Sequence, residues 1–354
     1  MFLLGIESSC DETAAAVLTD EPRVLSSIVA TQIAIHHPYG GVVPELASRE
    51  HLRNIRPVVQ QALAEARVEL SGINYLAVTH APGLIGSLLV GVTYAKALAF
   101  ALGIPLIAVH HLEGHIFAAE LEHGPFPYPS LILIVSGGHS SLLFSEKREQ
   151  YGLVAQTRDD AAGEAYDKVA KLLGLGYPGG PIIDHLASEG NPKAYLLPMA
   201  RFSDGSLDLS FSGIKTAVVR LVNDRRILKT ASPKEPPSQE ICDLAASFQH
   251  AVIGVLLDRV KRAAAHLAPR SIVLTGGVAC NRGLRAVFQH YFEPGGIRVL
   301  FPRPEWTTDN AAMIAAAALP KALRGEYADL RTNAYATLPL TKERIFMPNP
   351  LKNN

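Results

Sequence analysis

The stretch that decides the fold is FLLGIESSCDETAAAVL, residues 2–18, in which two apolar runs flank a turn of small and polar residues. This pattern predicts two neighbouring strands joined by a tight turn. The stretch LILIVSGGHSSLLF at residues 131–144 repeats it, with Gly137 and Gly138 at the turn. One strand-turn-strand unit opening each half of the chain predicts two lobes built on a single plan.

Outward from these stretches, short apolar runs alternate with longer amphipathic or alanine-rich runs, which is typical of an α/β protein. The segment 223–239 mixes charged residues with prolines and is expected to be a surface loop or hinge. Strands are expected at residues 75–79 and 105–109, helices at residues 86–102, 160–174 and 310–319, and one or two helices at residues 243–267.

The composition limits the class of protein. The chain has 354 residues, 48% of them hydrophobic and 19% charged, with a net charge of zero. Such a composition excludes disordered, collagen-like and coiled-coil proteins. The 3 cysteines form neither a disulfide framework nor a CxxC pair, which favours a reducing compartment and predicts a cytoplasmic protein. The apolar run 81–95 is shorter than the roughly 20 residues that cross a bilayer, so no membrane association is expected.

A histidine pair is the strongest local signal. His111 and His115 in HHLEGH are four residues apart, so on a helix their rings project from one face, as two ligands of one metal ion require. A zincin peptidase would place a glutamate directly after the first histidine, whereas here Leu112 follows and Glu113 comes next. The peptidase template is not matched, and the pair could also cap a helix or bond backbone carbonyls.

Asp309 in EWTTDNAAMIAAAAL is the candidate for a third ligand, because a loop just before a helix leaves its carboxylate free to turn toward the histidines. Two histidines and one carboxylate suit zinc or ferrous iron with a position open to substrate. The alternative is that Thr308 or Asp309 is an ordinary helix N-cap.

Glycine-rich turns offer a second kind of site. Turns at residues 136–139, 179–181 and 276–277 allow backbone amides to approach a phosphate, and three such turns suggest a nucleotide. None matches a Walker or Rossmann motif. Asp11 and Glu12 lie at the first turn, where they could hold a cation, bind an amine or accept a proton, or simply belong to a polar turn. Asp167 is spaced for an ion pair with Lys171 on a solvated helix face.

Taken together, these segments closely resemble the TsaD family of tRNA threonylcarbamoyl-transfer proteins over nearly the whole chain. The motifs that carry the resemblance occur in family order. They are GIESSCDET, GGVVPELASREH, HAPGLIGSLLVG, HHLEGH, VSGGHSSL, DDAAGEAYDKVAKLLGLGYPGGP, FSGIKTA, GGVACN and TDNAAMIA.

The resemblance implies an α/β fold of two duplicated lobes of the actin-like, Hsp70-like ATPase superfold, with a ligand cleft between the lobes. We expect one lobe from residues 1–122 and 306–346, a second from residues 123–305, and a flexible tail at residues 347–354. The implied metal ligands are His111, His115 and Asp309, which would bind Fe²⁺ or Zn²⁺. The implied adenylate-binding residues are Ile134, Val135, Ser136, Gly137, Gly138, His139, Asp167, Gly180, Asp184 and Asn281, with Mg²⁺ as a possible companion of the nucleotide.

The activity that the resemblance implies is transfer of a threonylcarbamoyl group from threonylcarbamoyl-AMP to N6 of the adenosine immediately 3′ of the anticodon, in tRNAs reading codons that begin with A. Asp11 or Glu12 would orient the amine or take its proton. TsaB-like and TsaE-like proteins are the implied partners. Three alternatives remain open at this point: an actin-fold ATPase, a noncatalytic nucleotide-binding scaffold within a tRNA-modification complex, and a metalloprotease.

Overall fold

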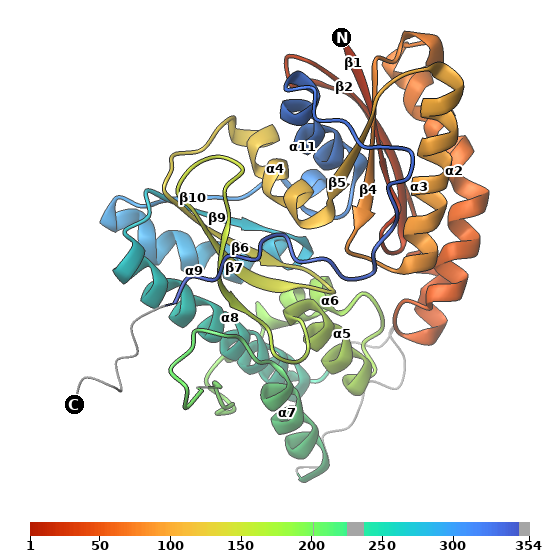
Figure 1. Ribbon diagram of the computed structural model, residues 1–354. Coiled ribbons are helices and arrows are strands. Elements are labelled where there is room, and N and C mark those ends of the chain that lie inside the picture. The colour runs from red at the N-terminus through yellow and green to blue at the C-terminus, as the bar shows by residue number, and fades with distance from the viewer. Residues whose placement is uncertain (201, 225–236, 347–354) are drawn as a thin grey trace. The chain divides into compact units, whose positions relative to one another are not determined.

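The computed structural model describes residues 1–200, 202–224 and 237–346, which form two compact units (Figure 1). The first unit comprises Met1–Pro125 and Pro302–Leu340, and the second comprises the described residues of Phe126–Phe301 together with residues 341–346. These boundaries lie a few residues from the expected ones at 122 and 306. Residues 341–346, expected in the first lobe, lie with the second unit. Most of the expected loop at 223–239 and all of the tail 347–354 are outside the described residues.

The first unit is built on a five-stranded mixed sheet whose strand order is β3-β2-β1-β4-β5. Strands β1, β2 and β3 are antiparallel neighbours, and β4 and β5 extend the sheet in parallel with β1. The strands are β1 (Phe2–Glu7), β2 (Glu12–Thr19), β3 (Val24–Thr31), β4 (Tyr75–Ala81) and β5 (Leu106–His110). The helices are α1 (Ile33–His36), α2 (Pro44–Ala66), α3 (Ile85–Leu102), α4 (His111–His123), α10 (Pro304–Thr307) and α11 (Ala311–Leu323), with short 3₁₀ turns at His37–Tyr39 and Leu70–Gly72.

Both faces of this sheet are covered, because successive side chains of a strand point to opposite faces. Leu3 of β1 packs in one apolar layer with α4 and α11, whereas Leu4 and Ile6 pack in the other layer with α2 and α3. Figure 1 shows the two helix pairs on the two sides of the sheet. The continuous apolar character of β1 and β2 therefore follows from burial on both faces.

Gly5 sets how closely α11 approaches the sheet. A Cβ atom at this position would lie 2.5 Å from the backbone oxygen of Ala311 and 3.0 Å from the Cβ of Ala315. The small residues of the alanine-rich run in α11 and the missing side chain at Gly5 thus bring helix and strand into backbone contact.

The second unit repeats the plan of the first. Its sheet has the order β10-β9-β6-β7-β8, with β6, β7 and β8 antiparallel and with β9 and β10 added in parallel with β6. The strands are β6 (Ser130–Val135), β7 (Ser140–Ser145), β8 (Gly152–Gln156), β9 (Ser271–Thr275) and β10 (Arg298–Leu300). The helices are α5 (Ala162–Leu173), α6 (Gly179–Ala187), α7 (Ser212–Asp224), α8 (Gln239–Leu267) and α9 (Arg282–Phe292), with 3₁₀ turns at Gly277–Cys280 and Glu293–Gly295.

The duplicated α/β architecture is confirmed. Each predicted strand-turn-strand unit is an antiparallel pair at the centre of one sheet, β1 with β2 and β6 with β7. Residues 243–267 belong to one helix that starts earlier, at Gln239, because Ser238 caps it by accepting a hydrogen bond from the amide of Ile241. The last predicted helix runs on to Leu323.

Two helices, α3 and α8, are long and apolar enough to cross a membrane by length and composition alone. Of the most apolar window of α8, 72% is buried inside the protein, so its composition is that of a core helix of the second unit. In α3 the corresponding share is 33%, and Leu88, Val92 and Ala95 form its inward face.

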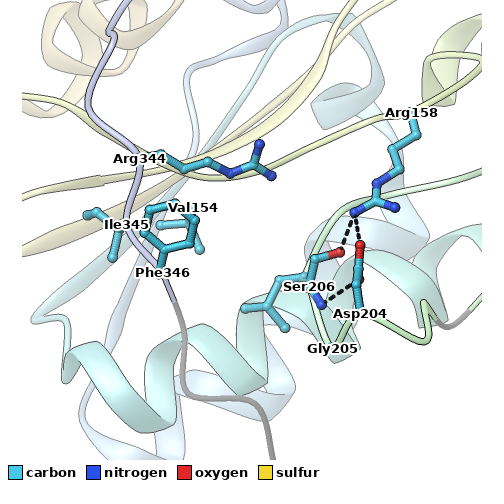
Figure 2. Close-up of a pocket in the computed structure, with 9 residues that line it drawn as sticks. Val154, Arg158, Asp204, Gly205, Ser206, Arg344, Ile345 and Phe346 are labelled. Atoms are coloured by element: carbon cyan, nitrogen blue, oxygen red, sulfur yellow. Dashed lines mark hydrogen bonds and ion pairs between the residues drawn. The ribbon is translucent and has the colours of Figure 1, made fainter.

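Residues 341–346 form hydrogen bonds with the second unit. The amide of Ile345 donates to the carbonyl of Leu153, and Arg344 donates to both carboxylate oxygens of the buried Asp208 at 2.9 and 3.1 Å. A cavity of about 340 Å³ lies beside this segment. Figure 2 shows its lining, in which Arg158 binds Asp204 and Ser206. None of the predicted site residues lines this cavity.

We expect the substitution Gly5→Ala to destabilise the first unit by about 1–3 kcal/mol, because the added methyl group overlaps backbone atoms of α11. Trp306, the only tryptophan of the chain, lies in α10 of this unit, so urea unfolding followed by its fluorescence reports the change. The control is Gly295→Ala, where an added Cβ meets no atom within 4 Å, and it should leave the unfolding midpoint unchanged. An unchanged midpoint for Gly5→Ala would contradict the close approach.

Candidate functional site

The histidine pair lies at the start of α4, directly after β5. His110 caps this helix: its Nδ1 accepts from the amide of Leu112 at 3.2 Å, and its Nε2 donates to the carbonyl of Leu338 at 2.9 Å. His111 and His115 follow on one helix face, with ring centroids 4.7 Å apart. A Cβ atom on Gly114, between them, would lie 2.7 Å from the Cδ1 of Ile314, so α11 packs directly against this turn of α4.

Asp309 precedes α11 and is not its N-cap. The side-chain oxygen of Asn310 accepts from the amide of Met313 at 2.9 Å, and its Nδ2 donates to the carbonyls of Trp306 and Thr308. Asn310 therefore caps the helix and fixes the loop before it, and the reading of Thr308 or Asp309 as the cap is wrong. The carboxylate of Asp309 turns to the histidines, with Oδ1 3.5 Å from Nε2 of His111 and 3.2 Å from Nε2 of His115.

These three groups suit a metal ion. One ligand atom from each of His111, His115 and Asp309 lies within 4.8 Å of the others. A tetrahedral site with ligands at about 2.0–2.1 Å has ligand atoms about 3.3 Å apart, which the separations of 3.5 and 3.2 Å from Asp309 bracket. His115 is fully buried, whereas the Asp309 side chain keeps 20% of its surface exposed. Two imidazole nitrogens and one carboxylate with an open side are a donor set for Zn²⁺ or Fe²⁺.

Glu7, at the end of β1, adds a second buried carboxylate beside His111. Its Oε2 lies 3.1 Å from Nδ1 of His111, and the hydroxyl of Ser9 lies 3.2 Å from the same nitrogen. Burial lowers the pKa of His111, but the carboxylates of Asp309 and Glu7 raise it more, to well above its ordinary value. Burial raises the pKa of Asp309, yet the two histidines bring it well below its usual range. The electrostatic field of Asp309 and Glu7 therefore favours a positive charge at His111.

The first turn places Asp11 and Glu12 in the same unit as the histidines. Burial, and after it the charges of Asp11 and Asp309, raise the pKa of Glu12 well above its ordinary value. His51 of α2 holds the turn in place: its Nδ1 accepts from the hydroxyl of Thr13 at 2.8 Å, and its Nε2 donates to the carbonyl of Cys10 at 3.0 Å. The chain thus brings a carboxylate pair and the histidine–aspartate cluster into one charged region.

In the second unit, the turn between β6 and β7 is closed by hydrogen bonds between Ser136 and His139, with Gly137 and Gly138 exposed at its tip. A Cβ atom added at Gly137, Gly138 or Gly180 would meet no atom within 4 Å, and none of these glycines has a left-handed φ. The fold itself therefore does not need glycine there, and the free space fits a ligand that lies against the backbone.

Ile134, Val135 and Asp167, which are also predicted to bind the adenylate, make contacts within the fold itself. Ile134 and Val135 lie in β6 and are fully buried. A ligand at this turn would therefore contact residues 136–139 instead. Asp167 accepts a hydrogen bond from the amide of Gly179 at 2.7 Å, which joins α5 to the start of α6. Its carboxylate therefore does more than lie on a solvated helix face.

A glutamine connects the two remaining predicted residues. Gln249 of α8 donates to Asp184 at 3.1 Å and accepts from Asn281 at 2.6 Å. Asp184 also accepts from the side chain and amide of Arg282. Sequence reasoning missed Gln249, because a polar residue inside a long helix carries no local signal. It also missed Glu7, for which a signal existed: a charged residue at the end of an apolar strand.

Glu113, the acidic residue between the histidines, pairs with Lys321 of α11. Its side chain is 7% exposed, and the ion pair joins α4 to α11. This role is structural, and it agrees with the sequence prediction that the zincin arrangement, in which the glutamate acts as base, is not matched.

Comparison with known proteins identifies relatives over the whole length. The sequence model of TsaD, described as tRNA N6-adenosine threonylcarbamoyltransferase, matches residues 23–316. The protein of that description from Moorella thermoacetica is 51% identical over 340 residues, covering 96% of this chain and 97% of the relative. The one from Syntrophotalea carbinolica is 50% identical over 353 residues, covering 99% and 100%.

Solved structures show the fold alone. HypF from T. kodakarensis matches with a TM-score of 0.59 and 14% identity, over 92% of this chain and 48% of that one. Component A of (R)-2-hydroxyglutaryl-CoA dehydratase from Acidaminococcus fermentans matches with a TM-score of 0.52 and 15% identity, over 91% and 99%. The chain therefore has the actin-like ATPase fold that the resemblance implies, with its duplicated plan repeated in the two units.

Acid should destabilise the turn that carries Asp11 and Glu12. Burial lowers the pKa of His51 below its ordinary value of about 6.5. Because the unfolded chain takes up this proton at a higher pH than the folded chain, the contribution of His51 to stability is complete above that value and declines as the pH falls below it. The variant His51→Gln should lose less stability than the native chain between about pH 7.5 and pH 5. Urea midpoints from Trp306 fluorescence measure this, and parallel declines would contradict it.

Proposed function

Because the chain belongs to the TsaD family of tRNA N6-adenosine threonylcarbamoyltransferases, we propose that it uses threonylcarbamoyl-AMP as donor and releases AMP. The chain is a transferase that modifies N6 of an adenosine in tRNA. The acceptor in this proposal is the adenosine immediately 3′ of the anticodon, in tRNAs that read codons beginning with A. The observation that carries the proposal is the cluster of two imidazoles and one carboxylate, in a chain that matches the family nearly end to end.

In this proposal His111, His115 and Asp309 hold one divalent ion, Zn²⁺ or Fe²⁺. Such an ion would supply Lewis-acid chemistry toward the carbamoyl oxygen or the threonyl carboxylate, at a gain of several kcal/mol. The partly exposed side of the cluster, at Asp309, is where a substrate oxygen can reach it.

The proposal assigns the handling of the N6 amine to two carboxylates of the protein, which orient it and accept its proton. The N6 amine of adenine is a weak nucleophile and must lose a proton as the new bond to the carbamoyl carbon forms. In the proposal, Asp11 and Glu12 orient this amine and accept its proton; this is supported by their position on the turn that His51 fixes, in the same charged region as Asp309. The AMP portion of the donor lies, in the proposal, against Gly137, Gly138 and Gly180, with Asp167, Asp184 and Asn281 around it.

The proposal includes TsaB-like and TsaE-like proteins as partners and the cytoplasm as location. The cytoplasmic placement rests on the cysteine content and on a tRNA substrate. A protease role is disfavoured, because Glu113 pairs with Lys321.

The test is a transfer assay with His111→Ala. The purified chain, its partner proteins, threonylcarbamoyl-AMP and unmodified tRNA are combined, and the tRNA nucleosides are analysed by mass spectrometry. We expect the variant to lose bound metal, measured by elemental analysis, and to form product at least about 100-fold more slowly. Both losses have one cause, the removal of a ligand.

The matched control is His290→Ala, an exposed histidine on α9, which should keep both metal and activity. Undiminished transfer by metal-free His111→Ala would overturn the Lewis-acid role. Phosphate release from ATP by the native chain, with no modified nucleoside in the complete assay, would instead favour an ATPase.

A further inference from the structure

Glu7 is a carboxylate buried to 0% exposure at the end of a central strand. Burying an ionised carboxylate is costly unless donors surround it. The hydroxyl of Thr79 donates to Oε2 at 2.6 Å, and the amide of Ser9 donates to Oε1 at 2.5 Å. The third neighbour is the imidazole of His111, whose Nδ1 lies 3.1 Å from Oε2. These contacts serve both oxygens and leave Glu7 with a fixed orientation.

The contact with Glu7 decides which nitrogen of His111 carries a proton. A carboxylate only accepts hydrogen bonds, so Nδ1 of His111 must be the donor. When His111 is a ligand of a metal ion, the other nitrogen, Nε2, gives up its proton and offers its lone pair, while Nδ1 keeps the proton that it donates to Glu7. Nε2 is the atom that faces Asp309, at 3.5 Å. Glu7, by contacting Nδ1, therefore determines that Nε2 is the nitrogen of His111 that can bind a metal ion.

We propose that Glu7 is a positioning residue that fixes the tautomer and ring orientation of His111 and thereby sets the affinity of the cluster for its metal ion. This inference rests on the proposed function, because it assumes that His111 is a ligand. The removal of hydrogen-bond partners behind metal-binding histidines costs about 10–100-fold in metal affinity in other proteins. Sequence reasoning assigned Glu7 no role.

The substitution Glu7→Gln tests this role because an amide cannot copy both carboxylate oxygens. If the amide oxygen keeps the bond from Ser9, the amide NH₂ group faces His111 and donates to Nδ1. The proton of the neutral imidazole then moves to Nε2, which is the atom that must bind the metal. Thr79→Val is the matched control: it removes another donor to the same carboxylate oxygen but does not touch His111.

The experiment measures Zn²⁺ affinity of the full chain by competition with a chelator at one fixed pH, together with the urea midpoint from Trp306 fluorescence. We expect Glu7→Gln to bind Zn²⁺ about 10–100-fold more weakly, and Thr79→Val to stay within about threefold of the native chain whatever its stability. Native-like affinity of Glu7→Gln, with binding lost in His111→Ala, would overturn the inference and leave the metal site intact. Equal affinity of His111→Ala and the native chain would instead remove the proposed metal site itself.

A second measurement needs no Glu7 variant, so it tests the tautomer of His111 on which the inference depends even if Glu7→Gln fails to fold. Nitrogen NMR of the histidine side chains in the Zn²⁺-loaded native chain separates protonated, free and metal-bound nitrogens. The His111 signals are assigned by their loss in His111→Ala. A protonated Nδ1 with metal on Nε2 supports the inference, and metal on Nδ1 or a proton on Nε2 overturns it.

Discussion

The first unit depends on the backbone contact between α11 and β1. Gly5 has no side chain and the facing run of α11 is mostly alanine, so the helix lies against the strand closely enough that a methyl group would overlap the backbone of Ala311. The same helix contacts α4 at Gly114, between the two histidines. Through these two contacts, residues from the two ends of the chain meet, and the loop before α11 brings Asp309 to His111.

This packing explains why a charged cluster is tolerated inside an apolar unit. Glu7, His111 and Asp309 come from three different elements, and each charge faces an opposite partner. Burial alone would shift the pKa of Asp309 up and that of His111 down, but the mutual attraction reverses both directions. The result is a site that favours cations beside a turn with two further carboxylates.

Much of this arrangement could be read from the sequence, because its signals are local. Helical spacing paired His111 with His115, and a carboxylate just before a helix suggested Asp309. The duplicated strand-turn-strand units predicted the two sheets. The partners of these residues could not be read in the same way: Glu7 touches His111, and Gln249 joins Asp184 to Asn281, only through tertiary packing. Asn310 rather than Asp309 capping α11 depends on the conformation of a single loop.

The division of the chain has a consequence for biosynthesis. The first unit is discontinuous, since Pro302–Leu340 completes what Met1–Pro125 begins. On the ribosome, the sheet that α11 covers emerges long before α11 itself. The face of the sheet that α11 covers therefore stays exposed while most of the second unit is synthesised. Domains generally fold as units, so until Pro302–Leu340 is made this incomplete core exposes apolar surface of the kind that aggregates and that chaperones cover.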